Sequence, residues 1–203
     1  MYCPDHFRED RLPVLHDAIR RIAFATLVTQ TQHGTDANNV PMLLDAEAGV
    51  LRFHLARANP AWRDLAPGAE ALAVFLGPHA YVTPSWYPSK AETGKAVPTW
   101  NYLTVHVRGG LTRFDDPEWL RAHVAALSAA HEAGRTEPWS PADAPPDYID
   151  AMLRGIVGFE LAITSLEGKW KLSQNRPPAD RDGVRQGLLD EGEATLARLM
   201  GEA

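Results

Sequence analysis

The chain has 203 residues, of which 45% are hydrophobic, so it can bury a sizeable core and is too apolar for a disordered protein. Its 26 acidic and 20 basic residues give a net charge of −6, which argues against a broad basic surface for nucleic acid. A single cysteine excludes an internal disulfide, no apolar stretch is long enough to span a membrane, and the polar start predicts no signal peptide. We therefore expect one cytoplasmic domain over residues 1–203.

The first part of the chain is typical of a short helix followed by an antiparallel meander. Asp10 can cap a helix over residues 11–20, where apolar residues recur at helical spacing. Strands are predicted over Phe24–Thr29, Val40–Leu44 and Val50–Leu55, because short turns separate these apolar runs.

Two more strands follow a polar helix start. Asn59-Pro60 predicts a short helix to about Leu65, since Asn is a strong N-cap and Pro fits the first helical position. Strands are predicted over residues 71–83, with Gly77-Pro78 inside, and over Thr99–Phe114, with a bulge or bend at Gly109-Gly110. Residues 83–97 read as a polar loop.

The second half adds helices to the sheet. Asp116-Pro117 starts a helix that ends at Gly134, and a further short helix is expected over residues 147–153. Alternating residues over 157–164 predict a strand, extended by 170–173, and the tail from Asp182 is helical. These elements predict a mainly β fold with helical additions (α+β), an antiparallel barrel, with a helical insertion around 115–154 and C-terminal helices around 182–201.

The common catalytic and nucleotide motifs are missing from the sequence. It has no GxGxxG, no GxxxxGK[ST], no HExxH and no GxSxG, so dinucleotide, P-loop, zinc-protease and serine-elbow sites are unsupported. The eight histidines are scattered, so we predict no metal site, and catalytic residues stay unassigned.

Three polar segments are candidates for a binding site. In His54–Pro60 a strand ends at an arginine just before a helix start, an arrangement that suits a phosphate, although an ordinary cap beside a solvated arginine explains it too. In Tyr81–Lys90 and Val97–Tyr102 aromatic side chains can sandwich a planar ring, or cover one end of the barrel or a dimer interface. In Lys169–Arg176 amide side chains can read the edge of a heterocycle, or the segment is a strand end with solvated charges.

Together these segments resemble the PaiB-type FMN-binding negative transcriptional regulators. The resemblance runs nearly end to end, from Met1-Tyr2-Cys3-Pro4 through five ordered blocks. The blocks are HLARANPAW (54–62), YVTPSWYPSK (81–90), VPTWNY (97–102), VHVRG (105–109) and KLSQNRP (171–177).

The resemblance implies an antiparallel FMN-binding split β-barrel, a homodimer with FMN at the interface, and transcriptional repression. It also implies contact with DNA, which the charge does not support. If FMN binds as in the family, Arg57 and the N–H groups after Asn59 would hold its phosphate. Lys90 or Ser85 would reach the phosphate or the ribityl chain. His54 would be either a ligand of FMN or part of the core. The ring would be bordered by Trp86, Trp100 or Tyr102, and its polar edge read by Asn101, Gln174 and Asn175.

Three functions remain open at this point. The first is an FMN-binding regulator that represses transcription. The second is a flavin-dependent oxidoreductase of the pyridoxamine-phosphate-oxidase-like split-barrel group, because bound flavin is itself redox-active. The third is a binding module that senses a metabolite or the flavin state, and fold analogy adds haem as another ligand. The sequence alone favours the regulator and does not decide whether the chain is an enzyme.

Overall fold

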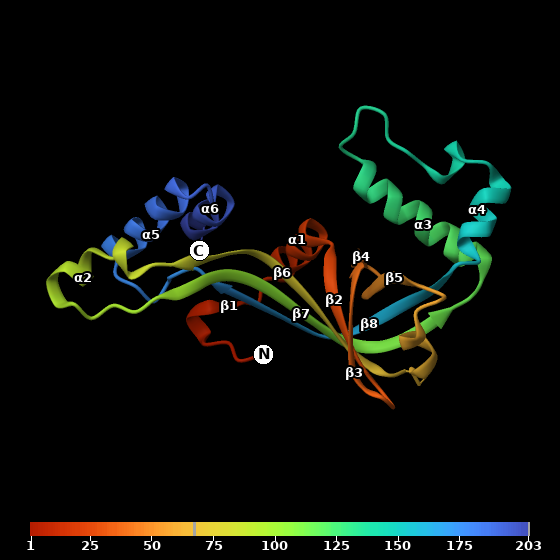
Figure 1. Cartoon of the computed structure of the whole chain (residues 1–203), viewed down its shortest axis with the longest axis horizontal. Helices are drawn as coiled ribbons and strands as arrows, with labels where there is room; N and C mark the ends of the chain where they lie inside the picture. The colour runs from red at the N-terminus through yellow and green to blue at the C-terminus, as the bar shows by residue number, and fades with distance from the viewer. Residues whose placement is uncertain (67, 203) are drawn as a thin grey trace. The chain divides into compact units, whose positions relative to one another are not determined.

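The computed structural model describes residues 1–66 and 68–202, and its strands form an eight-stranded sheet (Figure 1). Along the sheet the order is β3-β2-β6-β7-β8-β5-β4, and β1 pairs with β8. The strands are β1 (Arg8–Glu9), β2 (Phe24–Thr31), β3 (Gly34–Pro41), β4 (Leu43–Asp45), β5 (Val50–Ala56), β6 (Glu70–Val82), β7 (Thr99–Phe114) and β8 (Ile156–Lys171). The predicted class, mainly antiparallel β with helical additions, is confirmed.

Helices and short 3-10 turns connect or flank these strands. Within residues 1–66 and 68–202 no helix is both long and apolar enough to cross a membrane. The α-helices are α1 (Leu12–Ile22), α2 (Pro88–Thr93), α3 (Pro117–Glu132), α4 (Pro146–Leu153), α5 (Pro178–Asp190) and α6 (Ala194–Glu202). The 3-10 turns are η1 (Asp5–Phe7), η2 (Pro60–Asp64), η3 (Pro84–Trp86) and η4 (Pro141–Asp143).

Backbone contacts divide the chain into two compact units. Unit 1 contains residues 1–18, 75–106 and 167 onward, and unit 2 contains residues 19–74 and 107–166. The long strands β6, β7 and β8 each have one end in unit 1 and the other in unit 2. That the chain is one domain stays a prediction.

In unit 2, buried and half-buried residues alternate along β5. Leu51, Phe53 and Leu55 are buried, and the residues between them are half-buried, as expected for a strand with one face on a core. β5 pairs antiparallel with β8, and the ring of Phe53 stacks on that of Phe159 with centroids 5.4 Å apart. The same register places His54 opposite Gly158 on the other face.

Gly109 of β7 allows close packing of two strands. β7 runs without interruption from Thr99 to Phe114, the bounds predicted from the sequence. A Cβ on Gly109 would lie 1.8 Å from the carbonyl oxygen of Ala162 in β8. Any side chain at Gly109 would therefore force two backbones of unit 2 apart.

The helices of unit 2 form a small core of their own. Leu120 of α3 packs with Ile149 and Leu153 of α4, and Trp119 lies against this cluster. Asp116 caps α3, since its carboxylate accepts a hydrogen bond from the Trp119 backbone N–H at 2.9 Å. The predicted helix start at Asp116 is confirmed.

In unit 1 the C-terminal helices pack together, as Figure 1 shows for α5 and α6. Their inward faces bury Val184 and Leu188 of α5 and Leu196 of α6. α5 begins at Pro178, earlier than the predicted Asp182, because proline at the first helical position needs no N–H partner.

Two sequence predictions were wrong. The run Val40–Leu44 is two strands rather than one, because the backbone N–H of Met42 bonds to the carbonyl of Ala23, whose φ is +54°. The predicted loop 83–97 contains η3 and α2. The start signal of α2 is Pro88 at its first helical position, and its stop signal is Gly94, which ends the helix with φ +67°.

Candidate functional site

The residues predicted to bind FMN are distributed over both units. His54, Arg57 and Asn59 lie in unit 2. All the others lie in unit 1: Ser85, Trp86, Lys90, Trp100, Asn101, Tyr102, Gln174 and Asn175.

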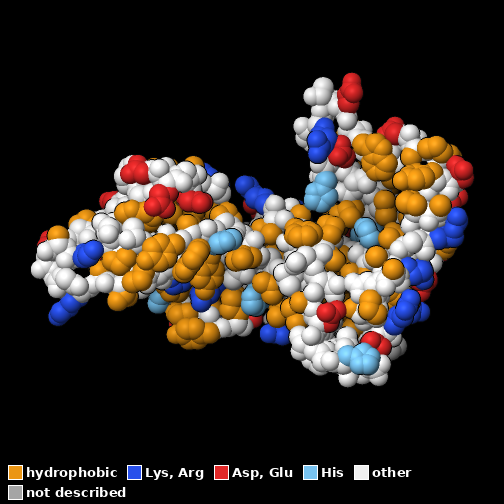
Figure 2. Space-filling view, in the orientation of Figure 1, with side chains coloured by type: hydrophobic (Ala, Val, Ile, Leu, Met, Phe, Trp, Pro, Cys, Tyr) orange, Lys and Arg blue, Asp and Glu red, His pale blue; other side chains and the backbone are white. Residues whose placement is uncertain are grey.

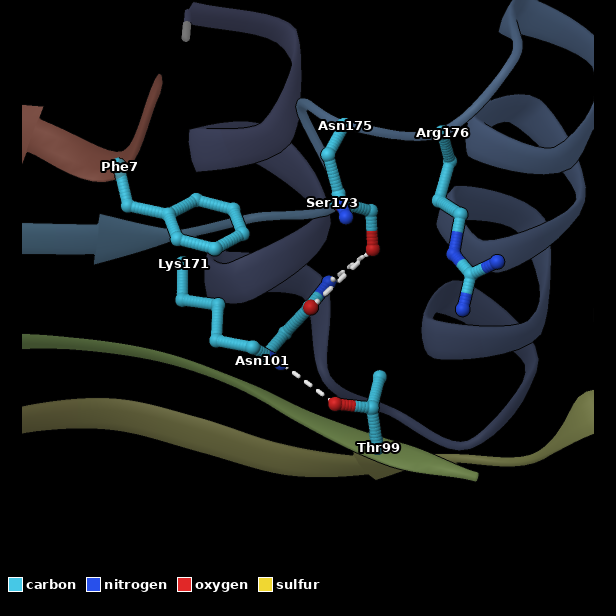
Figure 3. Close-up of a pocket in the computed structure, with 7 residues that line it drawn as sticks. All are labelled: Phe7, Thr99, Asn101, Lys171, Ser173, Asn175 and Arg176. Carbon is cyan, nitrogen blue, oxygen red and sulfur yellow. Dashed lines mark hydrogen bonds between the residues drawn. The ribbon is translucent and has the colours of Figure 1, made fainter. Parts of the chain in front are cut away.

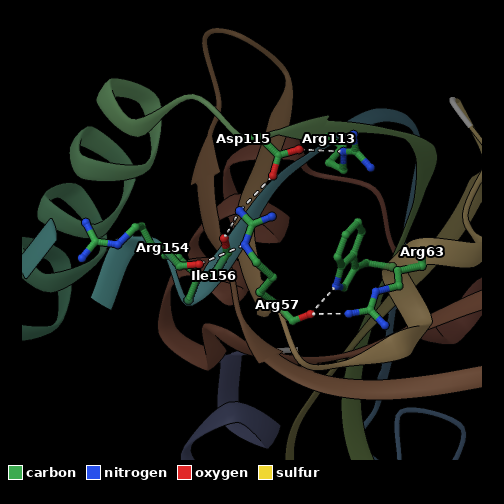
Figure 4. Close-up of polar contacts among 7 residues, drawn as sticks. Arg57, Arg63, Arg113, Asp115, Arg154 and Ile156 are labelled. Carbon is green, nitrogen blue, oxygen red and sulfur yellow. Dashed lines mark hydrogen bonds and ion pairs between the residues drawn. The ribbon is translucent and has the colours of Figure 1, made fainter. Parts of the chain in front are cut away.

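Arg57 follows β5 and is held firmly by unit 2 (Figure 4). Its Nε donates to the carbonyl of Arg154 at 2.9 Å, and its Nη2 donates to the carbonyl of Ile156 and to Oδ1 of Asp115, both at 2.9 Å. The guanidinium thus ties the end of β5 to the start of β8.

Further arginines gather around Arg57. The Trp62 indole N–H donates to the Arg57 carbonyl at 3.1 Å, and the guanidinium carbons of Arg63 and Arg113 lie 5.4 Å from the Trp62 ring. Arg113 also contacts Asp115, at 3.0 Å. We call Arg57, Trp62, Arg63, Arg113 and Asp115 the guanidinium cluster. It contains three guanidinium groups and one carboxylate, which contacts Arg57 and Arg113, so its net charge is positive and suits a phosphate.

Asn59 acts as the predicted helix cap. Its Oδ1 accepts a hydrogen bond from the Ala61 N–H at 2.9 Å, and its Nδ2 donates to Oδ1 of Asn38 at 2.7 Å. The helix that it opens is the 3-10 turn η2. The Ala61 N–H, which we expected to face an anion, is already bound by the Asn59 side chain.

His54, which is half-buried, is paired with a buried residue that the sequence did not single out. Its Nδ1 is hydrogen-bonded to Nε2 of His123 on α3, at 3.1 Å. The His123 ring stacks on Trp119 with centroids 5.2 Å apart, and Trp119 stacks on Phe114 at 4.4 Å. His123 is 3% exposed, and its Nδ1 has no hydrogen-bond partner among the described residues.

This burial changes the protonation of both rings. Burial lowers the pKa of His54. Burial, and then the nearby His54 and Arg52, lower the pKa of His123 to about 4. Both imidazoles are therefore neutral at pH 7.

Unit 1 contains a small cavity of about 90 Å³ between the start of β7 and the end of β8 (Figure 3). At its centre Asn101 and Ser173 bond reciprocally: Asn101 Nδ2 donates to the Ser173 hydroxyl at 3.0 Å, and that hydroxyl donates back to Asn101 Oδ1 at 3.1 Å. We call this cavity the cationic pocket; its lining is Phe7, Thr99, Asn101, Lys171, Ser173, Asn175 and Arg176.

Two cations flank the Asn101–Ser173 pair, one on each side in Figure 3. Lys171 donates to the Thr99 hydroxyl and to the Trp100 carbonyl. The guanidinium carbon of Arg176 lies 4.8 Å from the centre of the Tyr87 ring. Burial, and then the charges of Lys169 and Arg176, lower the pKa of Lys171.

The segment after β6 is fastened to a helix of its own unit. The Trp86 indole lies on α5 where that helix has glycine: a Cβ on Gly187 would lie 2.3 Å from the ring. Ser85 and Lys90 are exposed on η3 and α2. Trp86 therefore has a packing role, whereas Ser85 and Lys90 are free to meet a ligand.

Exposed aromatic rings lie on β6 and β7. Trp100 is 52% exposed and meets Tyr81 edge to face, with centroids 6.1 Å apart. Tyr102 lies next to the ammonium of Lys169, 5.4 Å from its ring centre. An exposed indole of this kind offers a face to a planar ring or to another protein chain.

The two amides near the C-terminal motif differ. Gln174 is used locally, since its Oε1 accepts from the Leu172 N–H at 2.7 Å and its Nε2 donates to the Trp170 carbonyl at 2.6 Å. Asn175 is exposed and lines the cationic pocket. Sequence reasoning selected these amides and missed the cations beside them, Lys171 and Arg176, although both stand in the quoted KLSQNRP block.

Among residues 1–66 and 68–202, no group of three or more potential metal-ligating side chains converges. Three polar centres of the described residues bear on a ligand: the guanidinium cluster, the His54–His123 pair and the cationic pocket.

Comparison with protein families matches residues 1–165 to a family described as "Putative FMN-binding domain". The chain is 30% identical over 204 residues to the Bacillus subtilis protein named "Protease synthase and sporulation protein PAI 2", covering 100% of this chain and 95% of the relative. It is 31% identical to an uncharacterized protein of Emericella nidulans, with 95% of this chain and 92% of the relative covered.

Solved structures with a similar fold have little sequence identity to this chain. The FAD and heme binding protein of Mycobacterium smegmatis superposes with a TM-score of 0.58 at 17% identity, over 81% of this chain and 73% of that one. A conserved hypothetical protein of Mycobacterium tuberculosis gives 0.59 at 12% identity, over 87% and 94%. These likenesses confirm the predicted split β-barrel fold.

Proposed function

The chain belongs to this FMN-binding family, with FMN as its cofactor, and from that premise we propose that it is a negative transcriptional regulator of the PaiB type. The observation that carries the proposal is the end-to-end match to the Bacillus subtilis relative, whose name refers to protease synthesis and sporulation. We further propose that the protein works in the cytoplasm as a homodimer with FMN at the interface.

The described residues fit this cofactor in three places. The guanidinium cluster and the cationic pocket each carry net positive charge for the phosphate, and Trp100 presents an exposed ring face for the isoalloxazine. When bound, FMN supplies one- and two-electron redox chemistry. Among the predicted residues, Arg57 is proposed to hold the phosphate, and Asn101 and Asn175 to lie near a polar edge of the ligand.

The experiment that tests cofactor binding is an absorbance spectrum of the purified protein, with mass analysis of the released flavin. We expect FMN. Arg57→Ala should lower FMN affinity by about 1.5–3 kcal/mol, the range for a charge-assisted hydrogen bond, and should affect riboflavin less, because riboflavin has no phosphate. Arg20→Ala, an exposed arginine of the same unit, is the control. Equal FMN affinity for Arg57→Ala and wild type would remove Arg57 as the anchor.

Direct DNA binding is the weakest part of the regulator proposal. On the face shown in Figure 2, acidic side chains lie over α5 and α6. Of the arginines on these helices, Arg198 is paired with Glu202, and Arg181 donates to the Met200 carbonyl. A mobility-shift assay with promoter fragments at low ionic strength tests this step. Salt-sensitive binding supports direct repression, and its absence would mean that repression needs a partner protein.

The oxidoreductase alternative is tested on the same preparation. NAD(P)H-dependent bleaching of the flavin band in the purified holoprotein would favour an enzyme of the split-barrel group. A spectrum that neither nucleotide changes would favour the regulator.

A further inference from the structure

The cationic pocket has the size of a charged group and not of a whole cofactor. Its volume is about 90 Å³, whereas sites that bury a drug-sized ligand usually measure about 300–1,000 Å³. Six of its lining side chains are polar or charged, and none of them is acidic. Thr99 and Ser173 supply hydroxyl groups, Asn101 and Asn175 supply amides, and Lys171 and Arg176 supply cationic donors. Such a lining suits a compact oxyanion.

Within residues 1–66 and 68–202, no carboxylate forms an ion pair with the cations of the pocket. Neither Lys171 nor Arg176 forms an ion pair with any carboxylate of the described chain. The carboxylates of neighbouring elements have other partners: Glu9 is paired with Arg11 at 2.5 Å, and Asp180 accepts the Ser89 hydroxyl at 2.7 Å. Glu167 is paired with the N-terminal ammonium at 2.9 Å.

Donor groups remain for a ligand. An ammonium has three N–H donors, and Lys171 uses two of them on Thr99 and the Trp100 carbonyl. The Arg176 guanidinium is placed by the Tyr87 ring beneath it, at 4.8 Å, so that it is oriented without a carboxylate. Both cations are thus positioned but not neutralised.

The backbone beside them is strained. Ser173 has φ +64°, a left-handed conformation that a residue other than glycine adopts at a cost. Its hydroxyl is held there by the reciprocal bonds with Asn101, which is fully buried. Strained backbone that is held in place by surrounding hydrogen bonds is frequent at ligand sites, because it can point side chains toward a ligand in directions that a relaxed turn does not allow.

We propose that the cationic pocket binds an oxyanion, with Lys171 and Arg176 as the charged donors and Ser173 and Asn175 beside them. The oxyanion is either the phosphate of FMN, in which case the pocket replaces Arg57 as the phosphate site, or the phosphate or carboxylate of a second small ligand. The first source rests on the proposed function, and the second does not.

The test uses orthophosphate as the probe, with isothermal titration calorimetry at low ionic strength on flavin-free and FMN-saturated protein. We expect Arg176→Gln to weaken orthophosphate binding about tenfold or more, because a charge-assisted contact is lost. Arg185→Gln, an exposed arginine on α5 of the same unit, should change binding less than about twofold, since surface substitutions away from a site have small effects. Lys171→Gln serves as a second variant on the other side of the pocket.

The two sources give different results. If FMN saturation blocks orthophosphate, and Arg176→Gln weakens FMN but not riboflavin, the oxyanion is the FMN phosphate. If FMN-saturated protein binds orthophosphate as well as flavin-free protein does, the pocket serves a second ligand. Orthophosphate binding that is absent from the wild type, or unchanged in both variants, would overturn the proposal. If the protein binds orthophosphate in this pocket but binds no flavin, FMN is not its cofactor, and the proposal that the pocket binds an oxyanion still holds.

Discussion

The guanidinium cluster of unit 2 and the cationic pocket of unit 1 concentrate the same kind of charge and use it differently. In the cluster, Arg57 is bound by two backbone carbonyls and by Asp115, which also holds Arg113. In the pocket, Lys171 and Arg176 have no carboxylate partner among the described residues. Charge that is satisfied within the chain stabilises the fold, whereas positioned charge without a counterion is available to a ligand.

This difference changes how an arginine in a sequence motif should be interpreted. Arg57 was the leading phosphate ligand because of its place before a helix start, yet the structure shows that much of its hydrogen-bonding capacity is used inside unit 2. Arg176 was not among the predicted ligands, and unlike Arg57 it forms no ion pair among the described residues. Three predictions test this contrast, and a fourth concerns the His54–His123 pair of unit 2.

The largest effect is expected for the stability of Arg57→Ala. Removing the guanidinium leaves the carbonyls of Arg154 and Ile156 without a donor, so we expect the free energy of unfolding to fall by about 2–3 kcal/mol. Urea unfolding of wild type and variant measures it, with Arg20→Ala as the control. A loss below about 0.5 kcal/mol, the scatter of ordinary surface substitutions, would contradict a structural role for Arg57.

The His54–His123 pair shows how unit 2 responds to a proton. The pKa of His123 is lowered to about 4 in the folded chain, while an unfolded histidine keeps its ordinary value near 6.5. Between these values the unfolded chain binds more protons, so the stability present above about pH 6.5 is lost as the pH falls toward 4. We expect unfolding free energy to drop by about 2 kcal/mol from pH 7 to pH 5.

Variants on α3 separate this histidine from other acid effects. His123→Leu should lose most of the pH dependence, while His131→Leu, exposed on the same helix, should retain it. Denaturant titrations at several pH values measure both. Parallel pH profiles for wild type and His123→Leu would show that the buried pair is not the cause.

Asp115→Asn should make the guanidinium cluster more like the cationic pocket. The carboxylate is 41% exposed, so its loss should cost only about 0.5–1 kcal/mol of stability. Arg57 and Arg113 then lack their counterion, and orthophosphate affinity at the cluster should rise. Calorimetry in an Arg176→Gln background isolates the cluster from the pocket. An unchanged affinity would mean that Asp115 does not restrain the cluster.

The smallest effect is expected for the stability of Arg176→Gln. Because Arg176 forms no ion pair within the described chain, its replacement should shift the free energy of unfolding by no more than about 0.5 kcal/mol. The same urea titration measures it. A loss above about 1 kcal/mol would make Arg176 a structural residue like Arg57 and would end the contrast.

Local signals in the sequence predicted much of the fold. The alternation of β5, the caps Asn59 and Asp116, and the bounds of β7 all depend on neighbouring residues, and the structure confirms them. The helix hidden in 83–97 was missed because its signals, Pro88 and Gly94, were interpreted as loop residues.

The site could not be predicted in the same way, because its contacts join distant parts of the chain. His54 meets His123 at a separation of 69 residues, and Lys171 meets Thr99 at a separation of 72. Spacing along a strand or helix carries no signal for such pairs. The family resemblance located the segments, and only the packing showed which side chains are satisfied.

The place of Trp86 on Gly187 couples two stretches of unit 1 that are far apart in the sequence. A second link joins them, since Asp180 of α5 accepts hydrogen bonds from Ser89 of α2. The segment of η3 and α2 can therefore separate from the rest of unit 1 only if it loses its contacts with α5. Amide hydrogen exchange would then report one cooperative opening event for both stretches, and a chain truncated before Pro178 would leave the segment unprotected.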